Sequence, residues 1–227
     1  MIFLLLIGLP ILLLIDWFHK GLLYGGGDIG LSLYNPILIL HIVENSWWSG
    51  QETGFSYPNQ LSTVPMYFIL SVIQKLGANP MMIQIFFFFF ILSLSATGMY
   101  FLTKKLSQNT RIALFVTFFY EINPYVMINV WHRFSYTAMV MLVAIPWTVY
   151  LIMRFLKEKK YRFLFILLFS SLLFAYDFNT PAFIATWWFI IVLTWIYVFF
   201  TDATTNKKRV YYILSFILFC LFWIGIN

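Results

Sequence analysis

An acidic residue on a glycine-rich turn is the first group in this chain that could do chemistry. Asp28 follows three consecutive glycines in the segment 24–30, which reads Tyr-Gly-Gly-Gly-Asp-Ile-Gly. Glycine adopts positive φ freely and allows close approach, so the turn presents this carboxylate with few side chains around it. Such a carboxylate can accept a proton from an acceptor hydroxyl as a general base. A solvated turn at the exit of a membrane helix is the alternative interpretation.

Later segments carry residues that could bind a phosphate or a sugar. An arginine can hold a phosphate through two parallel hydrogen bonds, which makes His132 and Arg133 candidates for holding a phosphate leaving group. Three further polar residues are candidate substrate ligands: Glu121, Asp177 and Asn179. Aromatic side chains suited to stacking on sugar rings are also present: Phe55, Tyr57 and Trp131. For each of them the alternative is a structural role as a helix cap, an interface anchor or part of an aromatic belt.

The composition identifies the class of protein that must position these residues. Of the 227 residues, 62% are hydrophobic and only 10% are charged, whereas soluble domains carry about 25% charged residues. We therefore expect an all-α, polytopic membrane protein in which residues 1–227 form one transmembrane core embedded in a lipid bilayer. The sequence contains no Walker loop and no cluster with zinc-ligand spacing, and no metal site is predicted.

Apolar runs predict about seven transmembrane helices, because a span needs about 20 apolar residues. Between the first two spans, residues 16–78 form a first outer loop with interfacial helices. One of these helices begins at Asn35-Pro36, an N-cap followed by proline, and runs to about Trp48. The other covers 62–77. The seven predicted spans are 2–15, 81–102, a short third span ending near 122, 136–153, a fifth span ending near 175, 182–200, and 211 onward.

Basic residues predict the orientation of the chain. The turns 103–111, 154–162 and 202–209 hold eleven of the fourteen Lys and Arg residues, and the other side holds six of the eight acids. The positive-inside rule then places the N-terminus in the cytoplasm and the Asp28 loop outside the plasma membrane. Basic turns beside an anionic leaflet account for the net charge of +6, so no nucleic-acid partner is expected.

Short motifs occur in an order that resembles the GT-C superfamily of membrane glycosyltransferases, and more narrowly the N-terminal part of its arabinofuranosyltransferase (AftD-like) branch. The resemblance is carried by Gly27-Asp28, Asn35-Pro36, Trp47-Trp48, residues 50–60, residues 64–68, residues 122–124, residues 144–147 and residues 175–179.

This resemblance implies an inverting transfer from a polyprenyl-phosphate-linked sugar donor to a cell-envelope glycan acceptor on the outer face, with Asp28 as the base. Members of that branch are several times longer, so the chain is expected to correspond to an N-terminal fragment. We expect no cofactor and leave a divalent cation as an alternative. Ser32 stands where the family tends to have a second acid, and this departure argues against a metal-binding or paired-acid role. Two other readings of the chain are a transporter or flippase, and a non-catalytic membrane scaffold.

Overall fold

The computed structural model describes residues 2–25, 33–45, 47–48, 55–56, 58–129, 133, 135–175, 180–203 and 205–226. Nearly all of this part is helical, which confirms the expected all-α class. Within it, four helices are long and apolar enough to cross a membrane: α4 (Pro80–Ser107), α7 (Tyr136–Glu158), α9 (Pro181–Asp202) and α10 (Asn206–Ile226). The membrane class is therefore supported by the structure.

The predicted count of seven spans is not confirmed. Three other predicted spans correspond to α1 (Ile2–Phe18), α5 (Thr110–Glu121) and α8 (Tyr161–Phe174). These helices have 17, 12 and 14 residues, fewer than the roughly 20 residues that a straight span requires.

The first outer loop folds into short elements, and the helix predicted over 62–77 is among them, at Val64–Lys75. They are α2 (Pro36–Val43), the 3₁₀ helix η1 (Pro58–Thr63), α3 (Val64–Lys75) and the strands β1 (Trp47–Trp48) and β2 (Phe55–Ser56). The first helix was expected to reach Trp48, but it ends at Val43, and β1 pairs antiparallel with β2 instead. At this end the Asn45 amide donates to the carbonyl of His41 at 2.7 Å, satisfying a carbonyl of the last turn.

Three Asn-Pro pairs start helices in this protein. The asparagine caps the helix while proline occupies its first position, where no backbone N–H is needed. The pair Asn35-Pro36 starts α2 as predicted, and Asn79-Pro80 and Asn123-Pro124 start α4 and the short helix α6 (Pro124–Ile128). In each case the asparagine side chain accepts a hydrogen bond from the backbone three residues on: Leu38, Met82 and Val126.

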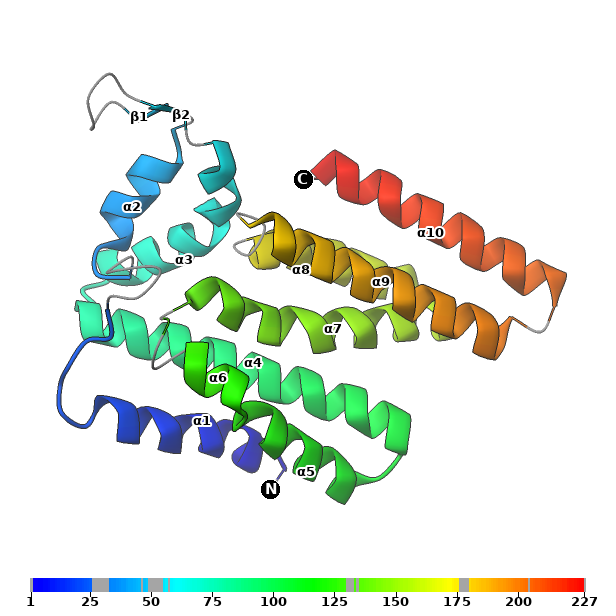
Figure 1. Ribbon diagram of the computed structural model, residues 1–227, viewed down its shortest axis with the longest axis horizontal. Coiled ribbons are helices and arrows are strands. Elements are labelled where there is room, and N and C mark those ends of the chain that lie inside the picture. Colours follow the sequence, from blue (N-terminus) through cyan, green and yellow to red (C-terminus); the bar gives the residue numbers. More distant parts are fainter. Residues whose placement is uncertain are drawn as a thin grey trace.

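The helices α4 and α7 form the centre of the bundle (Figure 1). Helices α1 and α5 pack on α4, α8 and α9 pack on α7, and α10 lies against α9 at the edge. Most side chains in the first half of α7 are buried, including Tyr136, Met139 and Ala144. The core therefore lies along α4 and α7, and the other helices turn much of their apolar surface outward.

The three basic turns lie at the same end of this bundle, as the sequence predicted. Lys105 is close enough to Glu158, and Lys157 to Asp202, for their charges to interact. The Lys159 ammonium lies 5.3 Å from the ring centroid of Tyr211, which joins the turn after α7 to the start of α10. Figure 1 shows the ends of α4 and α9 and the start of α10 on one side of the molecule.

Gly98 of α4 leaves room for Trp147 of α7, and we expect Gly98→Ala to destabilise the protein. A β-carbon there would lie 2.7 Å from Cδ1 of Trp147. The indole is itself fixed, because its N–H donates to the carbonyl of Leu94 at 2.9 Å. Overpacking of this kind costs about 1–3 kcal/mol. Thermal unfolding in detergent should therefore show a lower Tm.

The matched control for this substitution is Gly8→Ala in α1. A β-carbon at Gly8 meets no atom within 4 Å, so the Tm should stay the same or rise, since alanine favours helix over glycine. An unchanged Tm for Gly98→Ala would show that the two helices separate easily at this contact.

Candidate functional site

The backbone just before Asp28 is held by a glutamine of α4. Asp28 itself lies in residues 26–32, outside the described residues, but Tyr24 and Gly25 are described. The backbone N–H of Tyr24 donates to Oε1 of Gln84 at 2.9 Å, and Nε2 of Gln84 donates to the carbonyl of Tyr24 at 2.6 Å. Gln84 is buried, with 1% of its surface exposed. One amide therefore binds both polar groups of the same peptide segment.

Aromatic side chains from three helices surround Tyr24. Its ring lies 5.3 Å from that of Phe18 and 6.1 Å from that of Phe88, and its hydroxyl donates to the carbonyl of Trp17 at 3.3 Å. From α7, the hydroxyl of Tyr136 donates to the carbonyl of Tyr24 at 3.5 Å. Burial, with a smaller contribution from the Asp16 carboxylate, raises the pKa of the Tyr24 phenol to about 12. Tyr24 is therefore a neutral donor near pH 7.

A second glutamine holds the backbone that follows the Asp28 segment. Oε1 of Gln74 in α3 accepts a hydrogen bond from the backbone N–H of Ile37 at 2.9 Å, and Nε2 of Gln74 donates to Oδ1 of Asn35 at 3.1 Å. Leu33 is fully buried just before this contact. The two flanks of residues 26–32 are thus attached to α4 and α3, and we call Gln84 and Gln74 the flank clamps.

The flank clamps lie at the end of the bundle opposite the basic turns. Gln84 is four residues from the start of α4. The last residue of α4, Ser107, leads into the first basic turn. At about 1.5 Å per residue, Gln84 and Ser107 are roughly 35 Å apart along the helix, a little more than the roughly 30 Å hydrocarbon thickness. The Asp28 flanks and the basic turns are therefore spaced as groups on opposite membrane faces would be.

Glu121 occupies a different depth from the flank clamps. The sequence suggested a position at the outer end of the third span, but its Oε1 accepts a hydrogen bond at 2.5 Å from Ser95, in the middle of α4. Ser95 lies eleven residues after Gln84, or roughly 16 Å along the helix. The cause is the length of α5, whose 12 residues extend only part of the way along α4.

The environment of Glu121 is closed to solvent. The side chain is 1% exposed, and its Oε2 has no hydrogen-bond partner within the described part of the chain. The Ser95 hydroxyl also approaches the carbonyl of Leu92 at 3.1 Å. The single proton of the Ser95 hydroxyl is therefore shared between two acceptors, Oε1 of Glu121 and the carbonyl of Leu92.

Of the other predicted site residues, the structure describes two. Arg133 is exposed between α6 and α7, and Phe55 lies in β2, where its backbone pairs with Trp48. The remaining candidates lie outside the described residues and stay predictions: Asp28, Tyr57, Trp131, His132, Asp177 and Asn179. Among the described residues, no group of three or more His, Cys, Asp and Glu is placed to hold a metal ion.

Sequence reasoning missed the flank clamps, although the sequence contains a signal for one of them. Gln84 stands near the start of a run of 22 residues, 81–102, that contains no charged residue. An amide buried in such a helix costs free energy unless it finds partners, so its presence indicates a specific hydrogen-bonded role. Its partners in the loop before Asp28 are 60 positions away, and only the fold identifies them.

In comparisons with known proteins, no family model, no curated protein and no solved structure matches this chain. What the protein does must therefore be inferred from its own residues, charges and packing.

Proposed function

We propose that this chain forms the core of a GT-C-like membrane glycosyltransferase with Asp28 as the general base. The enzyme transfers a sugar from a polyprenyl-phosphate-linked donor to a cell-envelope glycan acceptor on the outer membrane face. The observation that carries this proposal is the pair of flank clamps, since Gln84 and Gln74 hold the backbone on both sides of the segment that contains Asp28. A general base needs such fixed flanks in order to meet its substrate in one geometry.

The chemistry needs two groups on the same face of the membrane. The base removes a proton from the acceptor hydroxyl as that oxygen attacks the anomeric carbon, and the bond from that carbon to the phosphate oxygen breaks. A cation must hold the departing phosphate, and Arg133 is the described candidate because its side chain is exposed. It lies three residues before Tyr136, whose hydroxyl reaches the Tyr24 carbonyl on the Asp28 flank.

The charge distribution supports an outward-facing site. The three basic turns share one end of the bundle, and the flank clamps lie at the other. Under the positive-inside rule the basic end is cytoplasmic, so Asp28 faces the outside of the plasma membrane.

The experiment that tests this proposal is transfer from a panel of polyprenyl-phosphate sugars. The protein in its full natural length would be reconstituted in liposomes, supplied with each radiolabelled donor and a cell-envelope glycan, and assayed for label in the glycan. We expect one donor to be used, with inversion at the anomeric carbon. No transfer from any donor by folded protein would overturn the glycosyltransferase proposal, and retention of configuration would contradict a mechanism with a single base.

Transport is the second candidate function, favoured by Glu121 at the break between α5 and α6. Intramembrane carboxylates and interrupted helices are typical of transport pathways. Here a buried carboxyl group ends one helix, and the next begins at Pro124 after two intervening residues. Movement of a lipid-linked sugar across the liposome membrane without sugar transfer would favour this function. A folded protein with neither activity would favour the non-catalytic scaffold.

A further inference from the structure

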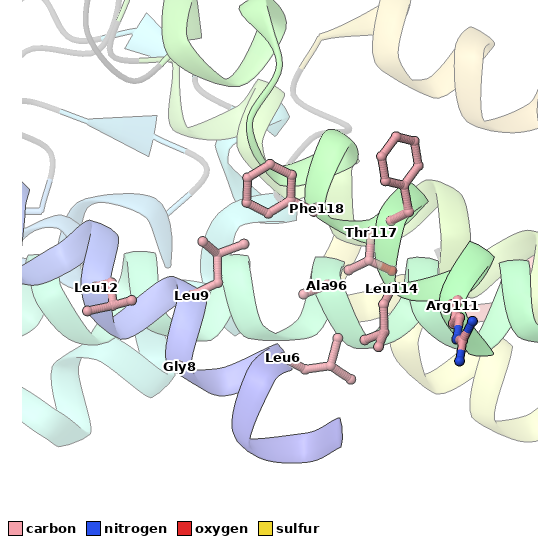
Figure 2. A pocket seen from close by; sticks show the side chains of 10 residues that line it. Leu6, Gly8, Leu9, Leu12, Ala96, Arg111, Leu114, Thr117 and Phe118 are labelled. Atoms are coloured by element: carbon pink, nitrogen blue, oxygen red, sulfur yellow. The ribbon is translucent and has the colours of Figure 1, made fainter. Parts of the chain in front are cut away.

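A groove with almost wholly apolar walls lies between α1 and α5, over the surface of α4. Its volume is about 600 Å³, which is within the roughly 300–1,000 Å³ of small-molecule sites. Figure 2 shows its walls from the α1 and α5 sides, with the small Ala96 side chain of α4 between them. The apolar lining residues include Leu6, Leu9, Leu12, Leu114 and Phe118.

The packing of α1 explains why this groove is open. Near its start α1 is close to α4 and α5, where Leu6 is buried in one cluster with Ala96, Tyr100 and Ala113. Two residues further along α1, Gly8 lines the groove without a side chain, and a β-carbon there would meet no atom within 4 Å. Both α1 and α5 therefore pack against α4 at the level of Leu6, and the groove lies between them where Gly8 provides no side chain.

One end of the groove is positively charged. Arg111, at the start of α5, lines the groove and lies beyond Leu114 in Figure 2, at the end away from Leu12. Its guanidinium forms no ion pair with a carboxylate in the described part of the chain. Lys104 of α4 donates a hydrogen bond to Thr110, which places a second cation beside the same turn.

We propose that this groove binds one anionic glycerophospholipid from the leaflet at the basic end of the bundle. An acyl chain lies along the apolar wall, and the lipid phosphate accepts hydrogen bonds from Arg111. The pattern matches an amphipathic lipid because the wall is apolar for its length and charged at one end. Basic pockets between membrane helices recognise anionic headgroups in this way, and a guanidinium matches phosphate through two parallel hydrogen bonds. This site is independent of the chemistry proposed for Asp28.

The headgroup is tested with phosphatidylglycerol and phosphatidylcholine that carry the same acyl chains. The full chain, purified in detergent, is titrated with each lipid, and bound lipid is counted by native mass spectrometry. We expect one phosphatidylglycerol to bind more tightly than phosphatidylcholine. Arg111→Gln should weaken phosphatidylglycerol binding about fivefold. The control is Arg162→Gln, because Arg162 is exposed on another basic turn, and it should leave binding unchanged.

The acyl-chain wall is tested with Gly8→Leu. A β-carbon at this position meets no atom within 4 Å, and the rest of the leucine side chain should occupy the groove. The tight binding of lipid should therefore be lost while the Tm stays within a few degrees. Gly225→Leu is the control, because a β-carbon at Gly225 in α10 also meets nothing within 4 Å, and it should have no effect on binding.

Several results would overturn this proposal. Equal binding of both lipids, unaffected by Arg111→Gln and Gly8→Leu, would mean that the groove holds only bulk lipid. Displacement of phosphatidylglycerol by soluble glycerol phosphate at equal concentration would show that the phosphate is bound without any contribution from the apolar wall of the groove. Tight binding of polyprenyl phosphate without phosphatidylglycerol binding would assign the groove to a different lipid. A dimer that Gly8→Leu dissociates would assign it to a second copy of the chain.

Discussion

Replacing Asp28 with asparagine is expected to lower sugar transfer by about 10²–10⁴-fold, which is the usual contribution of general acid–base catalysis. The substitution keeps the size of the side chain and removes its ability to accept the acceptor hydroxyl proton at neutral pH. Asp28 lies between two anchored flanks, whose contacts are made by Tyr24, Asn35 and Ile37 and do not involve its side chain. The fold should therefore be preserved, as checked by an unchanged Tm in detergent.

The matched control for Asp28→Asn is Asp16→Asn. Asp16 is an exposed acid near the end of α1, close enough to Tyr24 for its charge to raise the pKa of that phenol. If the loss of a negative charge at this face were enough to impair the enzyme, both variants would lose activity. We expect full activity from Asp16→Asn. Transfer by Asp28→Asn within a few fold of wild type would remove Asp28 from the role of base.

Local sequence signals predicted where several helices begin. The pair Asn35-Pro36 places a capping side chain and a proline in the order that a helix N-terminus requires, and α2 begins there. The end of the same helix was not predicted correctly. The predicted helix was extended across the polar residues 44–46 to Trp47-Trp48, and only the pairing of β1 with β2 shows that these two residues are extended.

The sequence predicted which distant segments lie together where their charges decide this. It did not predict it where long-range hydrogen bonds decide it. The common end of the three basic turns follows from the positive-inside rule, and the structure confirms that they lie together. The flank clamps join residues 60 and 39 positions apart, and hydropathy contains no information on such pairs. The depth of Glu121 was missed for a related reason, because it depends on how far the short helix α5 extends along α4.

Gln84→Met is expected to lower sugar transfer by about a hundredfold, although Gln84 touches no substrate in the proposed mechanism. Methionine fills a similar volume and provides no amide, so the N–H and the carbonyl of Tyr24 lose their partners on α4. The carbonyl keeps only the long hydrogen bond of 3.5 Å from the Tyr136 hydroxyl. A backbone group that loses its partner costs about 1–3 kcal/mol, and the flank can regain solvent hydrogen bonds only by moving. A displacement of about 1 Å at the reacting groups is enough for a hundredfold loss in rate.

A positioning role for Gln84 predicts a specific kinetic pattern. The value of kcat should fall by most of that factor while KM for the lipid-linked donor changes little, because the phosphate-binding residues are untouched. Thr97→Val is the matched control in the same helix, since the Thr97 hydroxyl donates to carbonyls within α4, at 2.8 Å to Ser93 and 3.0 Å to Leu94. It should retain full activity. If Gln84→Met lowers the Tm but leaves kcat unchanged, the clamp stabilises the fold without positioning Asp28, and the base must be held from elsewhere.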